Sequence, residues 1–170
     1  MQRVLNASNN LVYRDGCAFL MKTFITSSEQ ETIDLGCSIG IWASKGDIVL
    51  LFGDLGSGKT AMSKGIAKGL GVESCVTSPT FTLMQVYQGR LNLYHFDLYR
   101  LNNTDELADL GYEEFLFSDD GVAVVEWADR MQELIPERYL RVDIERMSEN
   151  TRKISMNFIE LVCDQQEDIL

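Results

Sequence analysis

Paired cysteines, long apolar runs and an excess of positive charge are all missing from this 170-residue sequence. Its cysteines, Cys17, Cys37, Cys75 and Cys163, are scattered, and no C-x-x-C pair offers a zinc or redox site. We therefore expect free thiols in a reducing compartment, the cytoplasm. No stretch approaches the roughly 20 consecutive apolar residues that a membrane helix needs, so we expect no membrane span.

The missing positive charge limits which partners the chain can bind directly. Its formal net charge is −11 at pH 7. Proteins that hold nucleic acid along an extended surface neutralise phosphates with clustered Lys and Arg side chains. The composition therefore argues against such a surface, and any nucleic-acid role would need a partner that supplies the positive charge.

Residues 22–170 contain no repeat, low-complexity tract or linker, so we expect a single domain there. The first 21 residues lack the sustained apolar segment of a secretory signal. Their Arg and Asn content, with only Asp15 acidic, leaves an organelle transit peptide open. The simpler interpretation of residues 1–21 is a loose N-terminal extension, whose order the sequence does not settle, upstream of a natural start at Met21.

What the sequence does contain is a phosphate-binding motif. Residues 53–60 fit G-x-x-x-x-G-K-[ST] at every fixed position. The apolar run 48–52 before it is typical of a parallel strand buried on both faces. A helix after it is indicated by three apolar residues at every fourth position and a terminal glycine: Met62, Ile66, Leu70 and Gly71. This order directs backbone N–H groups and a helix N-terminus at an anion, and predicts that a nucleoside triphosphate binds here.

Each residue of the motif then has an expected role. Lys59 should reach the β- and γ-phosphates, and the Thr60 hydroxyl should bind magnesium. The alternative for the motif is a structural glycine turn. The predicted nucleotide-binding residues are Gly53, Asp54, Leu55, Gly56, Ser57, Gly58, Lys59, Thr60 and Ala61.

The other segments predict an α/β protein of the P-loop NTPase class, with helices on both faces of a mainly parallel central sheet and antiparallel edge strands. A strand is expected at residues 23–26, and a helix after the capping-box pattern of residues 28–31. Its apolar face is predicted at spacings of three and four: Thr32, Leu35, Ile39 and Trp42. Thr104 is the predicted cap of a short helix that stops at Gly111, and residues 112–117 are expected to form one or two more turns.

Five further segments have strand patterns. Residues 82–87 and 90–96 predict a hairpin, and the apolar run 122–125 predicts a second buried parallel strand. Residues 140–144 and 154–158 alternate between apolar and polar, which predicts an antiparallel pair at the sheet edge.

Two acidic residues, Asp97 and Glu126, end predicted strands. In this fold class ligands lie at the carboxyl ends of parallel strands, so both are candidates for the site, with solvated strand-end carboxylates as the alternative. Glu126 follows the more continuous apolar strand, and we assign it to Mg²⁺ together with Thr60, directly or through water. Asp97 is then the water-orienting group, although the two roles could be exchanged.

Other side chains are weaker candidates. Thr80 follows the loop helix where nucleotide hydrolases place a switch segment, which makes it a candidate γ-phosphate sensor or else a hydroxyl in a proline turn. Trp127 is a candidate stacking lid or a core residue. His95, the only histidine, is expected to be a structural hydrogen-bonding residue rather than a general base. Arg100 and Arg130 are candidates to neutralise phosphate charge, or surface ion-pair partners.

Four segments in order resemble the bacterial tRNA threonylcarbamoyladenosine biosynthesis ATPase family of the TsaE type: Gly53–Thr60, Ser78–Phe81, His95–Arg100 and Val125–Trp127. The resemblance covers about residues 22–145. It implies a small magnesium-dependent ATP hydrolase that is weak alone and stimulated by partners. It also implies that these partners are the threonylcarbamoyl-transferase subunit and its paralogue, of the TsaD and TsaB type, and that the complex installs t6A at adenosine 37 of tRNA.

The resemblance also implies residue roles. Lys59 and Thr60 hold phosphates and Mg²⁺, Glu126 lies near the metal, and Thr80, Asp97 and Trp127 support hydrolysis. The sequence itself carries no N-K-x-D guanine signature. Contact with tRNA is expected only through the partners, in agreement with the net charge of −11.

Two other functions remain open on the residues alone. A small-molecule P-loop kinase would transfer the γ-phosphoryl group to a bound acceptor, but such kinases usually carry an Arg-rich lid that the sequence does not offer. A nucleotide-dependent binding module would use nucleotide without needing turnover.

Overall fold

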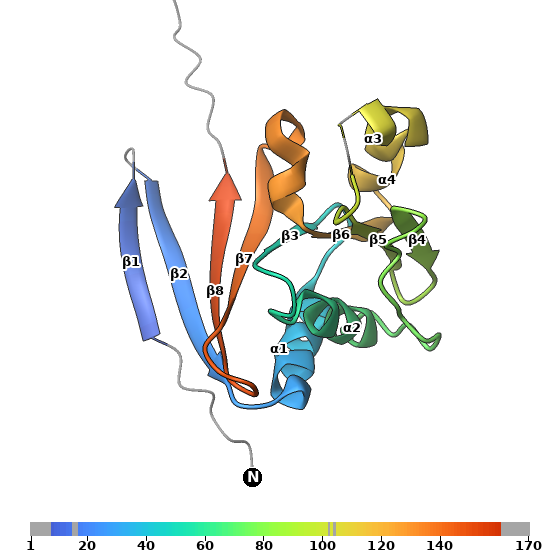
Figure 1. Ribbon diagram of the computed structural model, residues 1–170. Helices are drawn as coiled ribbons and strands as arrows, with labels where there is room; N and C mark the ends of the chain where they lie inside the picture. The colour runs from blue at the N-terminus through green and yellow to red at the C-terminus, as the bar shows by residue number, and fades with distance from the viewer. Residues whose placement is uncertain (1–7, 15–16, 102, 104, 161–170) are drawn as a thin grey trace, which may run out of the picture.

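The computed structural model describes residues 8–14, 17–101, 103 and 105–160. The strands are β1 (Ser8–Arg14), β2 (Cys17–Thr26), β3 (Ile48–Phe52), β4 (Met84–Tyr87), β5 (Asn92–Asp97), β6 (Gly121–Glu126), β7 (Arg138–Arg146) and β8 (Arg152–Glu160). The helices are α1 (Glu29–Trp42), α2 (Lys59–Gly69), α3 (Asp105–Leu110), α4 (Tyr112–Leu116) and the 3₁₀ helix η1 (Ala128–Leu134). The described strands form an eight-stranded sheet in the order β1-β2-β8-β7-β3-β6-β5-β4 (Figure 1).

The centre of the sheet is parallel, as predicted. β3 pairs in parallel with both β6 and β7, and β6 pairs in parallel with β5. Every residue of β3 and β6 is buried, because helices cover both faces of these strands. The predicted hairpin is also confirmed, since β4 and β5 pair antiparallel with Tyr87 opposite Leu93.

The prediction for the last two strands is only partly right. β7 and β8 do pair antiparallel, but β7 also pairs with β3, and β8 also pairs with β2. They therefore lie inside the sheet and not at its edge. Alternation of polar and apolar residues indicates that one face of a strand is solvated. It carries no information about which strands lie on either side of it in the sheet. β1 and the first part of β2 belong to the segment 1–21 that we interpreted as an extension, and β2 is longer than the strand predicted at 23–26.

Two clusters of buried side chains lie on opposite faces of the sheet. Val49 and Leu51 of β3 pack in a cluster with residues of α1 and α2. Ile48, Leu50 and Phe52 of the same strand pack in a cluster with residues of α3, α4 and η1. This period-two division confirms the predicted arrangement with helices on both faces.

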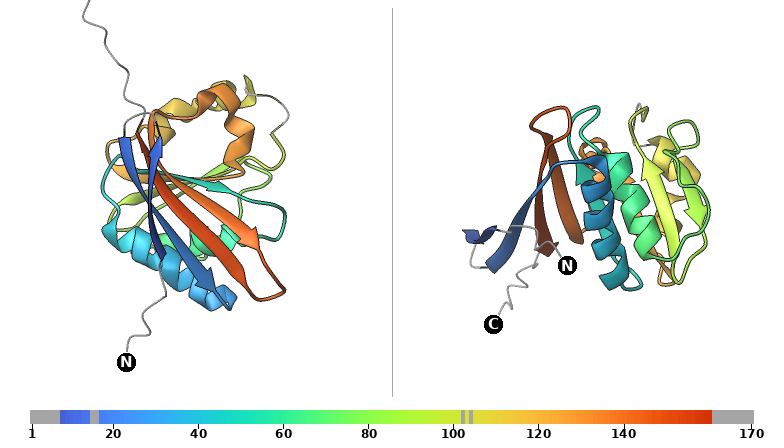
Figure 2. Two further views of the ribbon diagram at one scale, coloured as in Figure 1. Left: turned by 90° about the vertical axis from the view of Figure 1, so that its left-hand side faces the viewer. Right: turned by 90° about the horizontal axis from the view of Figure 1, so that it is seen from below.

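The helix α1 begins as predicted but packs differently. Ser28 is its N-cap and accepts a hydrogen bond from the Glu31 backbone N–H at 3.1 Å. Trp42, expected on the apolar face, is 85% exposed. Two of the other predicted residues, Thr32 and Leu35, are buried, and Ile39 packs against the core. The buried face also contains Gly36 and Gly40, and α1 and α2 lie side by side (Figure 2). Hydrophobic periodicity missed the two glycines because glycine contributes bare backbone to the contact.

The region after β5 forms two short helices, α3 and α4, as predicted. Gly111, with φ of 66°, ends the first and precedes the second. The predicted cap Thr104 lies outside the described residues, and the Asn103 side chain accepts a hydrogen bond from the Glu106 N–H at 3.2 Å. In the part of the chain that the structure describes, no helix has the length and apolarity needed to cross a membrane. Cys37 and Cys75 are free thiols.

Candidate nucleotide-binding site

The phosphate-binding motif forms the turn between β3 and α2. Gly53, Gly56 and Gly58 have φ values of 143°, 75° and 113°, which side chains with a Cβ rarely adopt. A Cβ added at Gly53 would also lie 2.3 Å from the carbonyl oxygen of Ile144. α2 begins at Lys59, so the unpaired N–H groups of its first turn lie at the loop. The predicted order of strand, loop and helix is confirmed.

Lys59 is held by the loop itself. Its Nζ donates to the Gly53 and Asp54 carbonyl oxygens at 2.6 and 2.9 Å, and lies 3.5 Å from the centre of the Trp127 ring. Burial lowers the pKa of the Lys59 ammonium, and this is partly offset by nearby carboxylates that raise it: Glu126, Asp129, Asp97 and Asp54. The ammonium is therefore a buried cation, held by the carbonyl oxygens of the loop that carries the phosphate-binding motif.

Glu126, at the end of β6, is only 1% exposed and is surrounded by hydrogen-bond partners. Thr60 donates its hydroxyl proton to Oε2 at 2.8 Å. The Ser63 hydroxyl and His95 Nε2 each lie 2.8 Å from Oε1. His95 Nδ1 is buried and has no partner among the described residues, so we infer that the ring carries its proton on Nε2 and donates it to Glu126. These contacts fix the carboxylate beside the loop helix.

Asp97 lies next to Glu126, because β5 and β6 pair with these two residues in register. Its Oδ2 accepts hydrogen bonds from the hydroxyls of Ser78 and Thr80, the latter at 2.9 Å. Its Oδ1 accepts from the Tyr99 backbone N–H at 3.0 Å. The structure therefore brings Thr80, which comes from the loop after α2, to the same strand end. The alternative given for Thr80, a proline turn, is present as well, since the Thr82 N–H donates to the Pro79 carbonyl oxygen at 3.0 Å.

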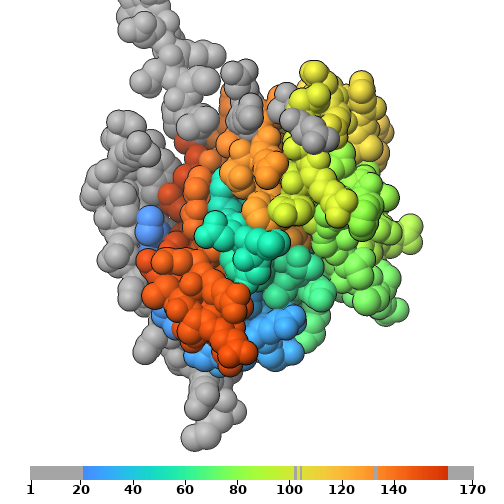
Figure 3. Space-filling view, in the orientation of Figure 1, coloured from blue at the N-terminus to red at the C-terminus, as the bar shows by residue number. Residues whose placement is uncertain are grey.

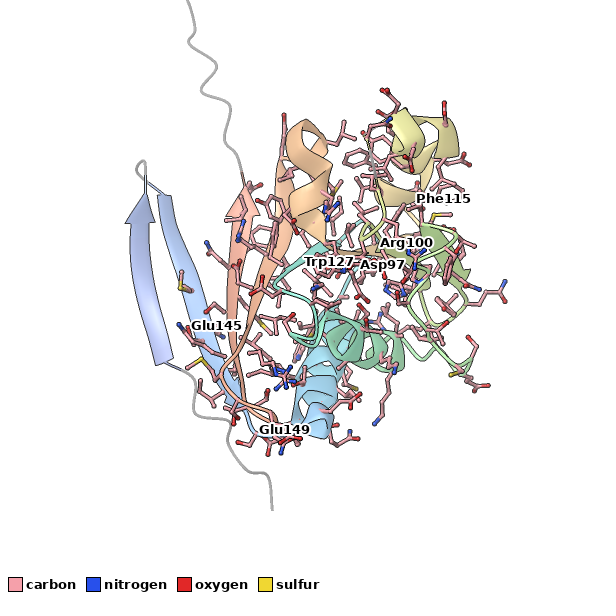
Figure 4. The ribbon with its side chains drawn as sticks, in the orientation of Figure 1. Asp97, Arg100, Phe115, Trp127, Glu145 and Glu149 are labelled. Atoms are coloured by element: carbon pink, nitrogen blue, oxygen red, sulfur yellow. The ribbon has the colours of Figure 1, made fainter. Side chains whose placement is uncertain are left out.

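Trp127 follows Glu126 in an unusual backbone conformation, with φ of 60° and ψ of 44°. Its ring contacts the Tyr99 ring at 4.8 Å between centres, besides covering the Lys59 ammonium. Figure 4 shows Trp127 and Asp97 close together at the strand ends, near the start of α2. The indole also packs against the buried cluster that contains Ala128 and Met131, so Trp127 both covers the Lys59 ammonium and borders the core.

These groups surround a cavity of about 390 Å³, within the range of ligand pockets. All five predicted catalytic residues line it: Lys59, Thr80, Asp97, Glu126 and Trp127. Of the predicted nucleotide-binding residues it is lined by Leu55, Gly56, Gly58, Lys59, Thr60 and Ala61, whereas Gly53, Asp54 and Ser57 do not line it.

The arginines are placed differently from the prediction. Arg100 lies over the Phe81 ring at 4.3 Å, and Arg130 lies 3.4 Å from the Leu101 carbonyl oxygen, so neither lines the cavity. The arginine that does line it is Arg152, whose Nε donates to the Ser57 carbonyl oxygen at 2.7 Å. No sequence pattern predicts this contact, because Arg152 comes from a distant strand. Ser63 could have been found, since it lies one helical turn after Thr60.

Comparison with known proteins agrees with this geometry. A family model described as threonylcarbamoyl adenosine biosynthesis protein TsaE matches residues 26–154. The chain belongs to the TsaE family. The match runs past the end of the resemblance predicted from the sequence, into β8.

Individual TsaE proteins are similar over most of their length. The tRNA threonylcarbamoyladenosine biosynthesis protein TsaE of Treponema pallidum is 39% identical over 132 residues, which cover 78% of this chain and 97% of the relative. Its counterpart in Bacillus subtilis is 40% identical over 145 residues, covering 82% and 90%. The crystal structure of Bacillus subtilis YdiB superimposes with a TM-score of 0.66 at 34% identity, covering 82% of this chain and 86% of that one. The TsaE family, to which this chain belongs, therefore takes part in forming threonylcarbamoyladenosine in tRNA.

Proposed function

We propose that this chain is a magnesium-dependent ATPase that hydrolyses ATP while docked on a threonylcarbamoyl-transferase complex of the TsaD and TsaB type, in the formation of t6A at adenosine 37 of tRNA. The observation that carries the ATPase is the contact of Thr60 with Glu126 beside a glycine loop that holds Lys59. Membership of the TsaE family supports the pathway. We place the reaction in the cytoplasm, with tRNA reached only through the partners.

The hydrogen bonds that the loop residues make to one another can be replaced by hydrogen bonds to phosphate. The Lys59 ammonium can leave the carbonyl oxygens of Gly53 and Asp54 for β- and γ-phosphate oxygens, which are stronger acceptors. The backbone N–H groups at the start of α2 add fixed donors for the same anion. The loop therefore binds the triphosphate without a large rearrangement of its backbone.

The hydroxyl of Thr60 and the carboxylate of Glu126 fit a magnesium ion. Both offer hard oxygen donors, the kind that Mg²⁺ prefers, and Thr60 points its proton at Glu126, which leaves its lone pairs free. When bound, the ion neutralises charge that develops on the β- and γ-phosphates. This hydrogen bond favours Glu126 over Asp97 as the residue near the metal.

Asp97 is suited to orient the attacking water. Its carboxylate lies beside Glu126 and already accepts hydrogen bonds from Thr80 and Ser78. Thr80 would exchange this contact for a γ-phosphate oxygen and so report its presence. Trp127 covers the Lys59 ammonium and limits water around it.

Phosphate release from labelled ATP and Mg²⁺, with and without the transferase partners, tests the proposal. We expect slow release by the chain alone and faster release with partners. A labelled acceptor would show a small-molecule kinase instead, and nucleotide-dependent binding without turnover would show a binding module.

A pair of isosteric variants tests the two carboxylates. Glu126→Gln should lower magnesium-dependent kcat by about 10²–10³-fold, because it removes the charge beside Thr60, while ATP binding stays within about fivefold. Glu114→Gln, on the exposed face of α4, is the matched control and should leave both unchanged. Loss of metal dependence in Asp97→Asn but not in Glu126→Gln would show that the two roles are exchanged.

A further inference from the structure

The two oxygens of the Glu126 carboxylate have different surroundings. Oε2 accepts the Thr60 hydroxyl proton at 2.8 Å. Oε1 has two partners of its own, the Ser63 hydroxyl and His95 Nε2, each at 2.8 Å. Thr60 and Glu126 line the cavity, whereas Ser63 and His95 do not line it and are fully buried. One oxygen therefore lies beside a residue of the cavity wall, and the other lies between two residues of the interior.

Both contacts at Oε1 are hydrogen bonds that this oxygen accepts. Ser63 Oγ lies 2.8 Å from Oε1 and 3.1 Å from the Lys59 carbonyl oxygen. The hydroxyl has one proton, and a charged acceptor forms the stronger bond, so we assign that proton to Oε1 of Glu126. His95 donates from Nε2, as its unpartnered Nδ1 indicates. Since Ser63, His95 and Glu126 are at most 1% exposed, bulk water does not compete for these bonds.

The acceptor sites that remain on Glu126 limit how it can meet a cation. An ionised carboxylate has about four lone-pair sites, two on each oxygen. Ser63 and His95 use both sites of Oε1, and Thr60 uses one site of Oε2. The site that is left lies on Oε2, so Glu126 can face a metal ion through this oxygen alone.

Magnesium and calcium differ in what they take from a carboxylate. Mg²⁺ requires near-octahedral coordination and keeps several waters, so one carboxylate oxygen suffices, directly or through water. Ca²⁺ takes about six to eight oxygen ligands and often binds a carboxylate through both oxygens. A carboxylate with a free site on one oxygen therefore suits Mg²⁺ and denies Ca²⁺ the second oxygen.

We propose that Ser63 and His95 are positioning residues that set the metal specificity of the site by keeping Oε1 of Glu126 occupied. This inference rests on the proposed binding of ATP with magnesium and adds how the chain selects that ion. Figure 3 shows the phosphate loop, in teal, at the surface, where a metal–nucleotide complex can reach it. Ser63 and His95 are buried, so they act on the ion only through Glu126.

Isothermal titration of the non-hydrolysable analogue adenylyl imidodiphosphate, with Mg²⁺, with Ca²⁺ and without metal, tests this by affinity instead of turnover. The unsubstituted chain should bind the magnesium complex at least about tenfold more tightly than the calcium complex. Ser63→Ala frees a site on Oε1 and loosens the carboxylate. We expect it to bind the magnesium complex about tenfold more weakly. Its affinities for the calcium complex and for the metal-free analogue should stay within about twofold, because calcium gains the oxygen that it lacked.

Three further variants separate the positioning role from a structural one. Ser38→Ala is the matched control, because the Ser38 hydroxyl also bonds a carbonyl oxygen one turn earlier, that of Asp34 at 3.2 Å, but is exposed on α1. It should leave all three affinities unchanged. His95→Leu removes the other donor to Oε1 and should lower the magnesium preference as Ser63→Ala does. His95→Gln keeps a donor nitrogen and should retain that preference.

Equal losses in all three titrations of Ser63→Ala would overturn the inference, since Ser63 would then act through the shape of α2 and its loop. Unchanged affinities in Ser63→Ala would overturn it as well. Equal affinity of the unsubstituted chain for the magnesium and calcium complexes would overturn it without any variant, so the test stands even where a variant fails to fold. Failure of the unsubstituted chain to bind the analogue at all would instead overturn the proposed function.

Discussion

Single residues in this site are already held by the kinds of contact that a nucleotide would replace. The Lys59 ammonium is bound to loop carbonyls, and the Thr60 hydroxyl and His95 both contact the Glu126 carboxylate. Trp127 keeps its ring over Lys59 with a left-handed backbone, which costs about 1–2 kcal/mol for a residue with a Cβ. That cost indicates that the position of the indole matters to the site.

The buried ammonium of Lys59 predicts a pH dependence of ATP binding. Burial lowers its pKa in the free chain, whereas bound phosphates favour the charged form. Binding therefore takes up protons once the free amine begins to lose its own, so ATP affinity should fall as pH rises above the lowered pKa. The limiting slope is about tenfold per pH unit, and dissociation constants measured between about pH 7 and 10 would show it.

Two variants of Lys59 complete that experiment. Lys59→Ala should weaken ATP binding by about ten- to a hundredfold near neutral pH, because it removes the charge that faces the phosphates. Lys59→Arg keeps a charge at every accessible pH, so its affinity should be flat over the range. The same downward slope in Lys59→Arg would show that another group titrates.

At the scale of elements, the contact between α1 and α2 is made through glycines. A Cβ added at Gly36 would lie 2.5 Å from the Met62 carbonyl oxygen, and one at Gly65 would lie 2.2 Å from the Ile33 carbonyl oxygen. Both obstacles are backbone, which cannot rotate away as a side chain can. The two helices therefore approach more closely than alanine would allow, and this approach helps fix α2, whose N-terminus carries the loop.

Gly65→Ala should destabilise the fold by about 2–4 kcal/mol, because the helices must separate to admit the methyl group. Urea denaturation would measure the loss. Ser38→Ala, on the exposed side of α1, is the control and should stay within about 0.5 kcal/mol. In an uncrowded helix, replacing glycine by alanine stabilises by about 1 kcal/mol, so a gain in stability would contradict the packing described here.

On the scale of the whole molecule, the charge and the site point to the same kind of partner. The net charge of −11 disfavours binding of the negatively charged RNA backbone. Near the cavity, two apolar side chains are exposed, Leu55 at 71% and Phe81 at 84%. Such side chains suit contact with protein. The proposed docking on a transferase complex agrees with both features.

The chain alone should bind tRNA with a dissociation constant above about 100 μM at physiological salt, since an acidic protein offers few Lys and Arg side chains to neutralise tRNA phosphates. Fluorescence anisotropy of labelled tRNA would measure this, first with the chain and then with the transferase partners present. Salt-dependent binding by the chain alone at lower concentrations would show a basic surface that the net charge conceals.

The sequence by itself determined the phosphate loop, the two buried strands and the two carboxylates that end β5 and β6. These features are local, because a glycine pattern, an apolar run and the residue that follows it lie together in the chain. Strand order follows from no such pattern, which is why β7 and β8 were expected at the edge of the sheet.

Only the tertiary structure decided which distant groups meet at the loop. Arg152 reaches Ser57 across 95 positions, and Ser63 and His95 meet at Glu126 from a helix and a strand. It also decided that bare glycine backbone forms the contact between α1 and α2, and that Trp42, which periodicity had placed on the apolar face with Thr32 and Leu35, is exposed. Both outcomes depend on close packing between segments far apart in the chain, and the sequence pattern of one segment does not contain the shape of the other.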